Sequence, residues 1–246
     1  MTDSALELSR IAQTNVALYR QMHDLGYEAK ALALARDAYG LVSVPFAGHY
    51  RACGKPFVCH LIGTASIMAA LGASAELVAA AILHAVYEPF FFVGNNQGTA
   101  RLTPHRIRAV VGEEVERHVA AYNDTKWSLV TIPALADEAR SVRGDRAGIL
   151  LLKLANEVDD HIDHSMAYCS ERRQEIDSAF DLWVGMANSL GYPVLAAALT
   201  EVRRETEQSE WARPLGTGRA TSHSVLSANA SSLSRLRARL RKLVEG

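Results

Sequence analysis

Residues 82–88, ILHAVYE, decide both the fold and the site of this 246-residue chain. They follow AELVAAA at residues 75–81, a run of small apolar side chains that is typical of a tightly packed, buried helix. His84 is therefore predicted to lie near the C-terminal end of a core helix. Because a buried imidazole needs partners for its ring nitrogens, we expect other polar side chains to converge on it.

Two further segments supply such side chains. KPFVCHLIGTASIMAALG at residues 55–72 carries His60 in a similar apolar setting. ILLLKLANEVDD at residues 149–160 is an apolar run interrupted by polar residues from Asn156 to Asp160. We expect these two segments to meet ILHAVYE at one site.

The composition is that of an ordinary globular protein with a large core, because 49% of the residues are hydrophobic and 22% are charged. The 26 basic and 27 acidic residues give a formal charge of -1, so no overall field attracts nucleic acid or an anionic membrane. The expected partner is a small molecule, with no nucleic acid and no membrane, and a homo-oligomer remains open.

Cysteine usage and hydropathy predict the compartment. The three cysteines, Cys53, Cys59 and Cys169, are odd in number and lack the spacing of a metal knuckle, which favours a reducing environment. No window reaches the roughly 18 apolar residues of a membrane span, and the N-terminal residues do not resemble a signal peptide. We therefore predict a cytoplasmic protein.

Helical periodicity dominates the chain, and the predicted fold class is all-α. Gly26, Ser74 and the pair Thr103–Pro104 have the residue types that end or begin helices. The predicted helices cover residues 4–25, 28–39, 56–71 and 74–84, the regions around 104–111 and 113–119, and residues 146–164, 172–190 and 192–207.

The predicted organisation is one helical domain followed by an appendage. The domain spans residues 1–212 and includes the N-terminal helix. Residues 213–229 have the Gly/Ser/Thr content of a flexible linker. Residues 230–246 form a predicted basic amphipathic helix with leucines on one stripe, suited to packing on this chain or on a partner subunit.

Four segments, in order, resemble the HD-domain phosphohydrolases, most closely the hydrolase domain of the RelA/SpoT-type guanosine tetraphosphate enzymes. They are RACGKPFVCHLIGTASIMAALG at 51–72, AAAILHAVYEP at 79–89, TPHRIRAVVGEEVERHV at 103–119 and LLKLANEVDDHID at 151–163. The resemblance implies an HD-like helical bundle with additional N-terminal and C-terminal helices. It covers roughly the middle half of the chain.

The resemblance also implies a metal site, which this sequence alters. In the family a divalent metal is held by an isolated histidine, an adjacent His-Asp pair and a distant aspartate, which correspond here to His60, His84-Ala85 and Asn156. Both histidines remain and both carboxylates are missing. Manganese and magnesium favour oxygen ligands, so the inherited site is expected to be weak or absent. Of the acidic pair that follows in the family, only Glu88 remains.

The sequence offers a replacement set. Residues four apart share a helix face, which pairs His84 with Glu88 and Asn156 with Asp160. A rebuilt site would use His60 and His84 with Glu88 or Asp160, a set suited to manganese, iron or zinc. Glu88 and His84 are then the candidate catalytic acid and base. The alternative is that no metal binds and the histidines join Asn156 in a neutral polar network.

The loop before His60 carries the candidate ligand-binding residues. Tyr50, Arg51 and Lys55 lie in the region that contributes to the nucleotide pocket of the family, and the two cations suit phosphate. Asn156 is the fourth candidate. Both cations could equally lie on the loop surface. By contrast, Glu157, Asp159 and Asp163 are assigned to a solvated helix face. A structural role is favoured for His161 and His164, with a surface cluster around Asp160 as the alternative.

Three functions remain open at this stage. The first is a divergent, hydrolase-like protein acting on or binding a phosphorylated small molecule or nucleotide, without efficient guanosine tetraphosphate hydrolysis. The second is a metal-free, inactive relative that serves as a ligand-binding or regulatory protein. The third is a non-hydrolytic enzyme that uses Glu88 and His84 as an acid/base pair. A fold resemblance alone does not choose between them.

Overall fold

A computed structural model describes residues 6–51, 53–87, 102–164, 170–208 and 223–224, and it confirms the all-α fold. The described helices are η1 (Leu8–Arg10, a 3-10 turn), α1 (Asn15–Asp24), α2 (Ala29–Ser43), α3 (Phe57–Ala70), α4 (Ala75–Leu83), α5 (Pro104–Val111), α6 (Glu113–Asp124), α7 (Ile132–Glu138), α8 (Gly144–His161), α9 (Ser170–Ser189) and α10 (Pro193–Gln208). Two short strands, β1 (His49–Tyr50) and β2 (His223–Ser224), complete the described elements.

Local sequence signals explain several helix ends. The Ser74 and Thr103 side chains accept hydrogen bonds from the backbone N–H groups of Leu77 and Arg106, so both predicted caps are confirmed. Gly26 has a positive φ of 85° directly after the first helix, as expected for a residue that ends it.

The first helix begins later than predicted. Residues 4–25 were expected to form one helix, but α1 begins at Asn15 after the separate turn η1. The backbone N–H of Ala12 donates to Ser66 Oγ on α3 at 2.8 Å, a tertiary hydrogen bond that holds the chain out of the helix. Thr14 then caps α1 by accepting from Ala17 N. Helix α7 was not predicted, because its seven residues are too few to show a periodicity.

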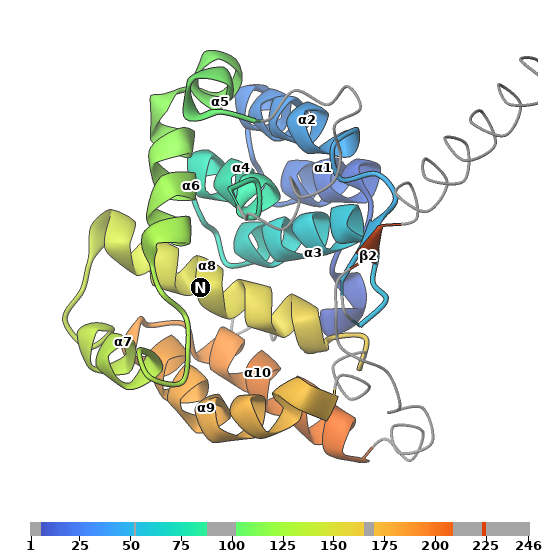
Figure 1. Cartoon of the computed structure of the whole chain (residues 1–246). Helices are drawn as coiled ribbons and strands as arrows, with labels where there is room; N and C mark the ends of the chain where they lie inside the picture. The colour runs from blue at the N-terminus through green and yellow to red at the C-terminus, as the bar shows by residue number, and fades with distance from the viewer. Residues whose placement is uncertain (1–5, 52, 88–101, 165–169, 209–222, 225–246) are drawn as a thin grey trace, which may run out of the picture.

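Helix α8 is the centre of the arrangement (Figure 1). It packs against α3 and α6 on one side and against α9 and α10 on the other. Helices α3 and α4 pack against each other across a short connection, and α2 covers α4. Because α3, α4 and α8 are all buried between other helices, the polar residues they carry face one another inside the core.

A short strand pair lies beside this centre. β1 and β2 pair antiparallel, with His49 opposite Ser224 and Tyr50 opposite His223. β2 falls within residues 213–229, which were predicted to be a linker. The rest of that segment and the predicted helix at residues 230–246 lie outside the described residues. None of the described helices has the length and hydropathy needed to cross a membrane.

Candidate functional site

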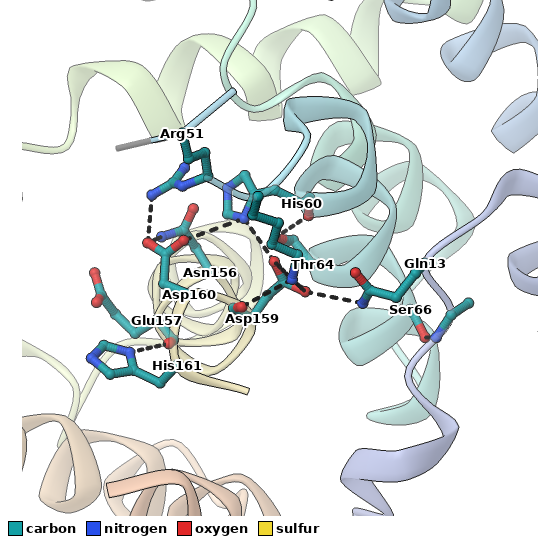
Figure 2. A network of polar contacts seen from close by, with 12 residues as sticks. Gln13, Arg51, His60, Thr64, Ser66, Asn156, Glu157, Asp159, Asp160 and His161 are labelled. Carbon is teal, nitrogen blue, oxygen red and sulfur yellow. Dashed lines mark hydrogen bonds and ion pairs between the residues drawn. The ribbon is translucent and has the colours of Figure 1, made fainter. Parts of the chain in front are cut away.

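The three segments singled out in the sequence converge on one buried polar cluster. Helix α3 supplies His60, which Figure 2 shows facing the polar residues of α8. His84 lies at the C-terminal end of α4. Helix α8 supplies the carboxylates of Asp159 and Asp160. The side chains of these four residues are almost completely inaccessible to solvent. Arg51 and Lys55 reach the cluster from the loop between β1 and α3, and Asn156 completes it from α8.

His60 lies at the middle of a chain of short contacts. Its Nε2 is 3.2 Å from Nε2 of His84, and its Nδ1 is 2.8 Å from Oδ2 of Asp159. Nδ1 of His84 is 2.7 Å from the carbonyl oxygen of Ala81. Oδ1 of Asp160 lies 3.4 Å from Nδ1 of His60. The histidines therefore contact each other on one edge of the His60 ring and the carboxylates lie on the other edge.

This chain of contacts requires one proton more than neutral imidazoles supply. A carbonyl oxygen only accepts, so His84 Nδ1 must carry a hydrogen and a neutral His84 then accepts at Nε2. His60 must donate from Nε2, which leaves its Nδ1 without a hydrogen and facing the Asp159 carboxylate. Three hydrogen bonds need three protons, while two neutral histidines and a carboxylate carry two. Two neutral imidazoles and an ionised Asp159 therefore cannot make all three contacts as hydrogen bonds.

Burial sets the direction of each titration. Removal from water, and next the nearby Arg51 guanidinium, lower the pKa of His60 well below its usual value. Burial and the neighbouring His60 lower the pKa of His84 well below its usual value. Burial also raises the pKa of Asp159, although Lys55 opposes that shift. All three shifts favour the less charged form of the group.

Two built-in cations neutralise the carboxylates. Nζ of Lys55 donates to both carboxylate oxygens of Asp159 at 2.8 Å and to its backbone carbonyl oxygen at 3.2 Å. The Arg51 guanidinium donates to Oδ2 of Asp160 at 2.6 Å. The Lys55 side chain is only 5% exposed and that of Arg51 16% exposed. These are buried charge-assisted contacts rather than surface ion pairs.

Neighbouring side chains hold the cluster in place. Gln13 donates to Oδ1 of Asp159 at 3.4 Å, and Asn156 donates to Oδ2 of Asp160 at 3.3 Å. On the far side, the His84 ring contacts the Tyr122 ring, with centroids 5.1 Å apart. Nζ of Lys153 lies 3.5 Å from the centroid of that tyrosine ring, a cation–π contact.

The assignment of Asp159 and Glu157 to a solvated helix face is wrong, because they are 0% and 3% exposed. His161, for which a structural role was favoured, is buried, and its Nδ1 donates to the carbonyl oxygen of Glu157 at 2.7 Å. A signal for Asp159 was present, because it continues the apolar stripe of Leu152 and Ala155 at the helical spacing of three and four residues.

The other predicted residues are placed as follows. Tyr50 lies in strand β1, and Asp163, directly after α8, is exposed. His164 is partly buried, and its Nε2 lies 3.8 Å from a carboxylate oxygen of Glu205. Glu88 lies outside the described residues, so its predicted pairing with His84 has no structural counterpart here.

The fit to a hydrolytic divalent metal is incomplete among the described residues. The Nε2 atoms of His60 and His84 have the separation of two nitrogen ligands on one ion, since bonds of about 2.1 Å give about 3–3.4 Å between ligands. No described carboxylate completes that set, because Asp159 and Asp160 lie at the opposite edge of the His60 ring. Lys55 and Arg51 already neutralise both. The predicted role of Asp160 as third ligand beside His84 does not match this geometry.

Comparison with known proteins adds one similarity. Residues 43–125 match a family model described as a domain of unknown function (DUF6817). This stretch includes α3, α4, α5 and all of α6, and it carries Arg51, Lys55, His60 and His84. It excludes α8 with both aspartates. No curated protein matches the chain.

Proposed function

We propose that this protein is a divergent, HD-like helical protein that binds a phosphorylated small molecule or nucleotide without a metal and without hydrolysing it. Among the three functions left open by the sequence, this corresponds to the ligand-binding or regulatory relative.

One observation carries the proposal: the Lys55 ammonium donates hydrogen bonds to both carboxylate oxygens of Asp159. A metal ion that supports hydrolysis needs anionic oxygen ligands. Here Asp159 and Asp160 are already paired with the cationic side chains of Lys55 and Arg51. Adding a divalent ion would place it beside Lys55 and Arg51, where like charges repel at short range. The site therefore keeps the shape of a metal centre while its charge is already balanced.

Arg51 and Asn156 are the members of the cluster that retain partial exposure. A ligand that approaches the cluster meets these two side chains first. The guanidinium of Arg51 has five N–H donors in a planar fork, which suits the oxygens of a phosphate group. This supports an anionic, phosphorylated ligand as the proposed class.

The test combines metal content with ligand binding. We expect protein purified without chelators to contain no stoichiometric metal, and its Tm not to rise with manganese, iron or zinc. A panel of mononucleotides and guanosine tetraphosphate, followed by calorimetry, should identify a phosphorylated ligand that raises the Tm, with no release of phosphate. Arg51→Gln should weaken that binding about tenfold or more, whereas Arg36→Gln on the exposed surface of α2 should not. Stoichiometric metal together with manganese-dependent phosphate release would overturn the proposal.

A metal-dependent hydrolase is the second candidate, and the geometry of the two histidines favours it. A cation between their Nε2 atoms would also remove the need for the third proton. His60 could then donate from Nδ1 to Asp159, and His84 from Nδ1 to Ala81, the usual support of histidines that bind a metal. When bound, such an ion would polarise a phosphoryl oxygen or acidify a water. The metal analysis above separates this candidate from the first.

A further inference from the structure

A second, different cation site is formed at the Nδ1 edge of His60. His60, Asp159 and Asp160 each offer one ligand atom, and these atoms lie within 4.8 Å of one another. Nδ1 of His60 is 2.8 Å from Oδ2 of Asp159 and 3.4 Å from Oδ1 of Asp160. Ligands on one divalent ion lie about 3 Å apart when each bond is about 2.1 Å. All three residues are buried, so the group differs from an ordinary surface cluster of acids.

This site already contains a cation supplied by the chain. The ammonium of Lys55 makes three contacts of 2.8–3.2 Å with Asp159, while Arg51 binds the outer oxygen of Asp160. An ammonium group and a metal ion both bind anionic oxygens. A metal ion at this site would also need Nδ1 of His60 free of hydrogen, whereas the ammonium does not. Nδ1 of His60 lies beside Asp159 at 2.8 Å.

We propose that Lys55 is the resident cation of a latent divalent-metal site formed by His60 Nδ1, Asp159 and Asp160. Removing the ammonium leaves two buried carboxylates with one guanidinium, an arrangement that favours uptake of an external cation. The inference rests on the proposed metal-free function, because it assigns to Lys55 the role that an ion would otherwise have.

The number of protons that the histidines supply is consistent with a metal ion at Nδ1 of His60 once the Lys55 ammonium is removed. With a metal at Nδ1, His60 donates from Nε2 to His84, and His84 donates from Nδ1 to the carbonyl oxygen of Ala81. Two neutral imidazoles then supply both hydrogens that the chain needs. A metal at Nδ1 therefore removes the need for a third proton.

The experiment compares cobalt and zinc binding in wild type, Lys55→Ala and the matched control Lys30→Ala, whose lysine is exposed on α2. Lys55→Ala should bind one ion per chain at least about 100-fold more tightly than the other two proteins, since a buried competing charge is gone. Lys55→Ala that folds only when metal is added also supports the proposal.

Further variants distinguish this site from a metal between the two histidines. The double variant Lys55→Ala, His84→Gln should still bind the ion. X-ray absorption should show that the ion is coordinated by one imidazole and by carboxylate oxygens. Loss of the ion in that variant, or two imidazole ligands, overturns the assignment to the Nδ1 edge. If Lys55→Ala does not fold even with metal, Lys55→Gln replaces it, because the amide retains a hydrogen-bond donor. Absence of binding in the folded variant overturns the proposal, whereas metal in wild type overturns the proposed function instead.

Discussion

At the scale of single residues, Asp159 connects the buried cation Lys55 to the pair of histidines. It is the partner of Lys55 at two carboxylate oxygens and of His60 at Nδ1. A buried ion pair adds little net stability, but removal of one partner leaves an uncompensated charge in the core. Asp159 is therefore needed to compensate the buried charge of Lys55, and the ion pair itself adds little to the stability of the fold.

Asp159→Asn is expected to reduce the free energy of unfolding by about 3–5 kcal/mol, because Lys55 then remains buried without its carboxylate. Urea unfolding followed by circular dichroism measures the change. Asp137→Asn, at a carboxylate that is 73% exposed, is the matched control and should change stability by less than about 0.5 kcal/mol.

The double variant Lys55→Met, Asp159→Leu should recover most of that loss, because both charges leave the core together. A loss below about 1 kcal/mol in the single variant would contradict the assignment of this contact as a buried ion pair.

At the scale of helices, the close approach of α3 and α8 depends on Gly63. A Cβ on Gly63 would overlap the Asp159 carboxylate, with Cγ of that residue only 2.6 Å away. A side chain at this position would therefore push the two helices apart or displace the carboxylate from Lys55 and His60. The glycine lies in the sequence IGTA, where nothing in the local pattern marks the contact.

Gly63→Ala is expected to destabilise the protein by about 3 kcal/mol or more. The new Cβ would overlap the buried Asp159 carboxylate, which Lys55 and His60 hold in place, rather than the flexible end of a side chain. Gly40→Ala in α2 is the control. A Cβ there meets nothing within 4 Å, and alanine favours the helix, so stability should stay equal or rise by up to about 1 kcal/mol. Equal stability of the two variants, measured by thermal unfolding, would show that α3 and α8 are less closely packed than described.

At the scale of the whole molecule, four buried histidines link stability to pH. Burial is the main cause that lowers the pKa of each one: His49, His60, His84 and His118. The unfolded chain titrates its histidines near about 6.5, so below that pH it binds more protons than the folded chain. The stability that depends on these groups is present above about pH 6.5 and is lost as the pH falls. The raised pKa of Asp159 acts in the opposite direction, from about pH 3.9 upward.

We therefore expect the free energy of unfolding to decline steadily between about pH 7 and pH 5.5 in urea titrations at constant ionic strength. His118→Gln should make this decline shallower, because one of the contributing groups is gone. His23→Gln, at a side chain that is 77% exposed, should leave the slope unchanged. A stability that stays constant or rises over this range would refute the link.

The sequence by itself determined the fold class, most helix positions and the convergence of three segments. Apolar periodicity around His60, His84 and Asn156 marks helices that must be buried on more than one face, and buried helices bring their polar residues together. Capping residues such as Ser74 and Thr103 added accurate helix starts, since a cap acts within a few residues of its own position.

Only the tertiary structure decided the chemistry of the cluster. Lys55 and Asp159 are 104 residues apart, and no local sequence pattern pairs one with the other. Which edge of the His60 ring faces the carboxylates, and which cation reaches them, depends on how α3 and α8 approach at Gly63. Hydrogen bonds and ion pairs act over about 3 Å, whereas periodicity fixes only the face of a helix, so the charge balance of the site is set by packing.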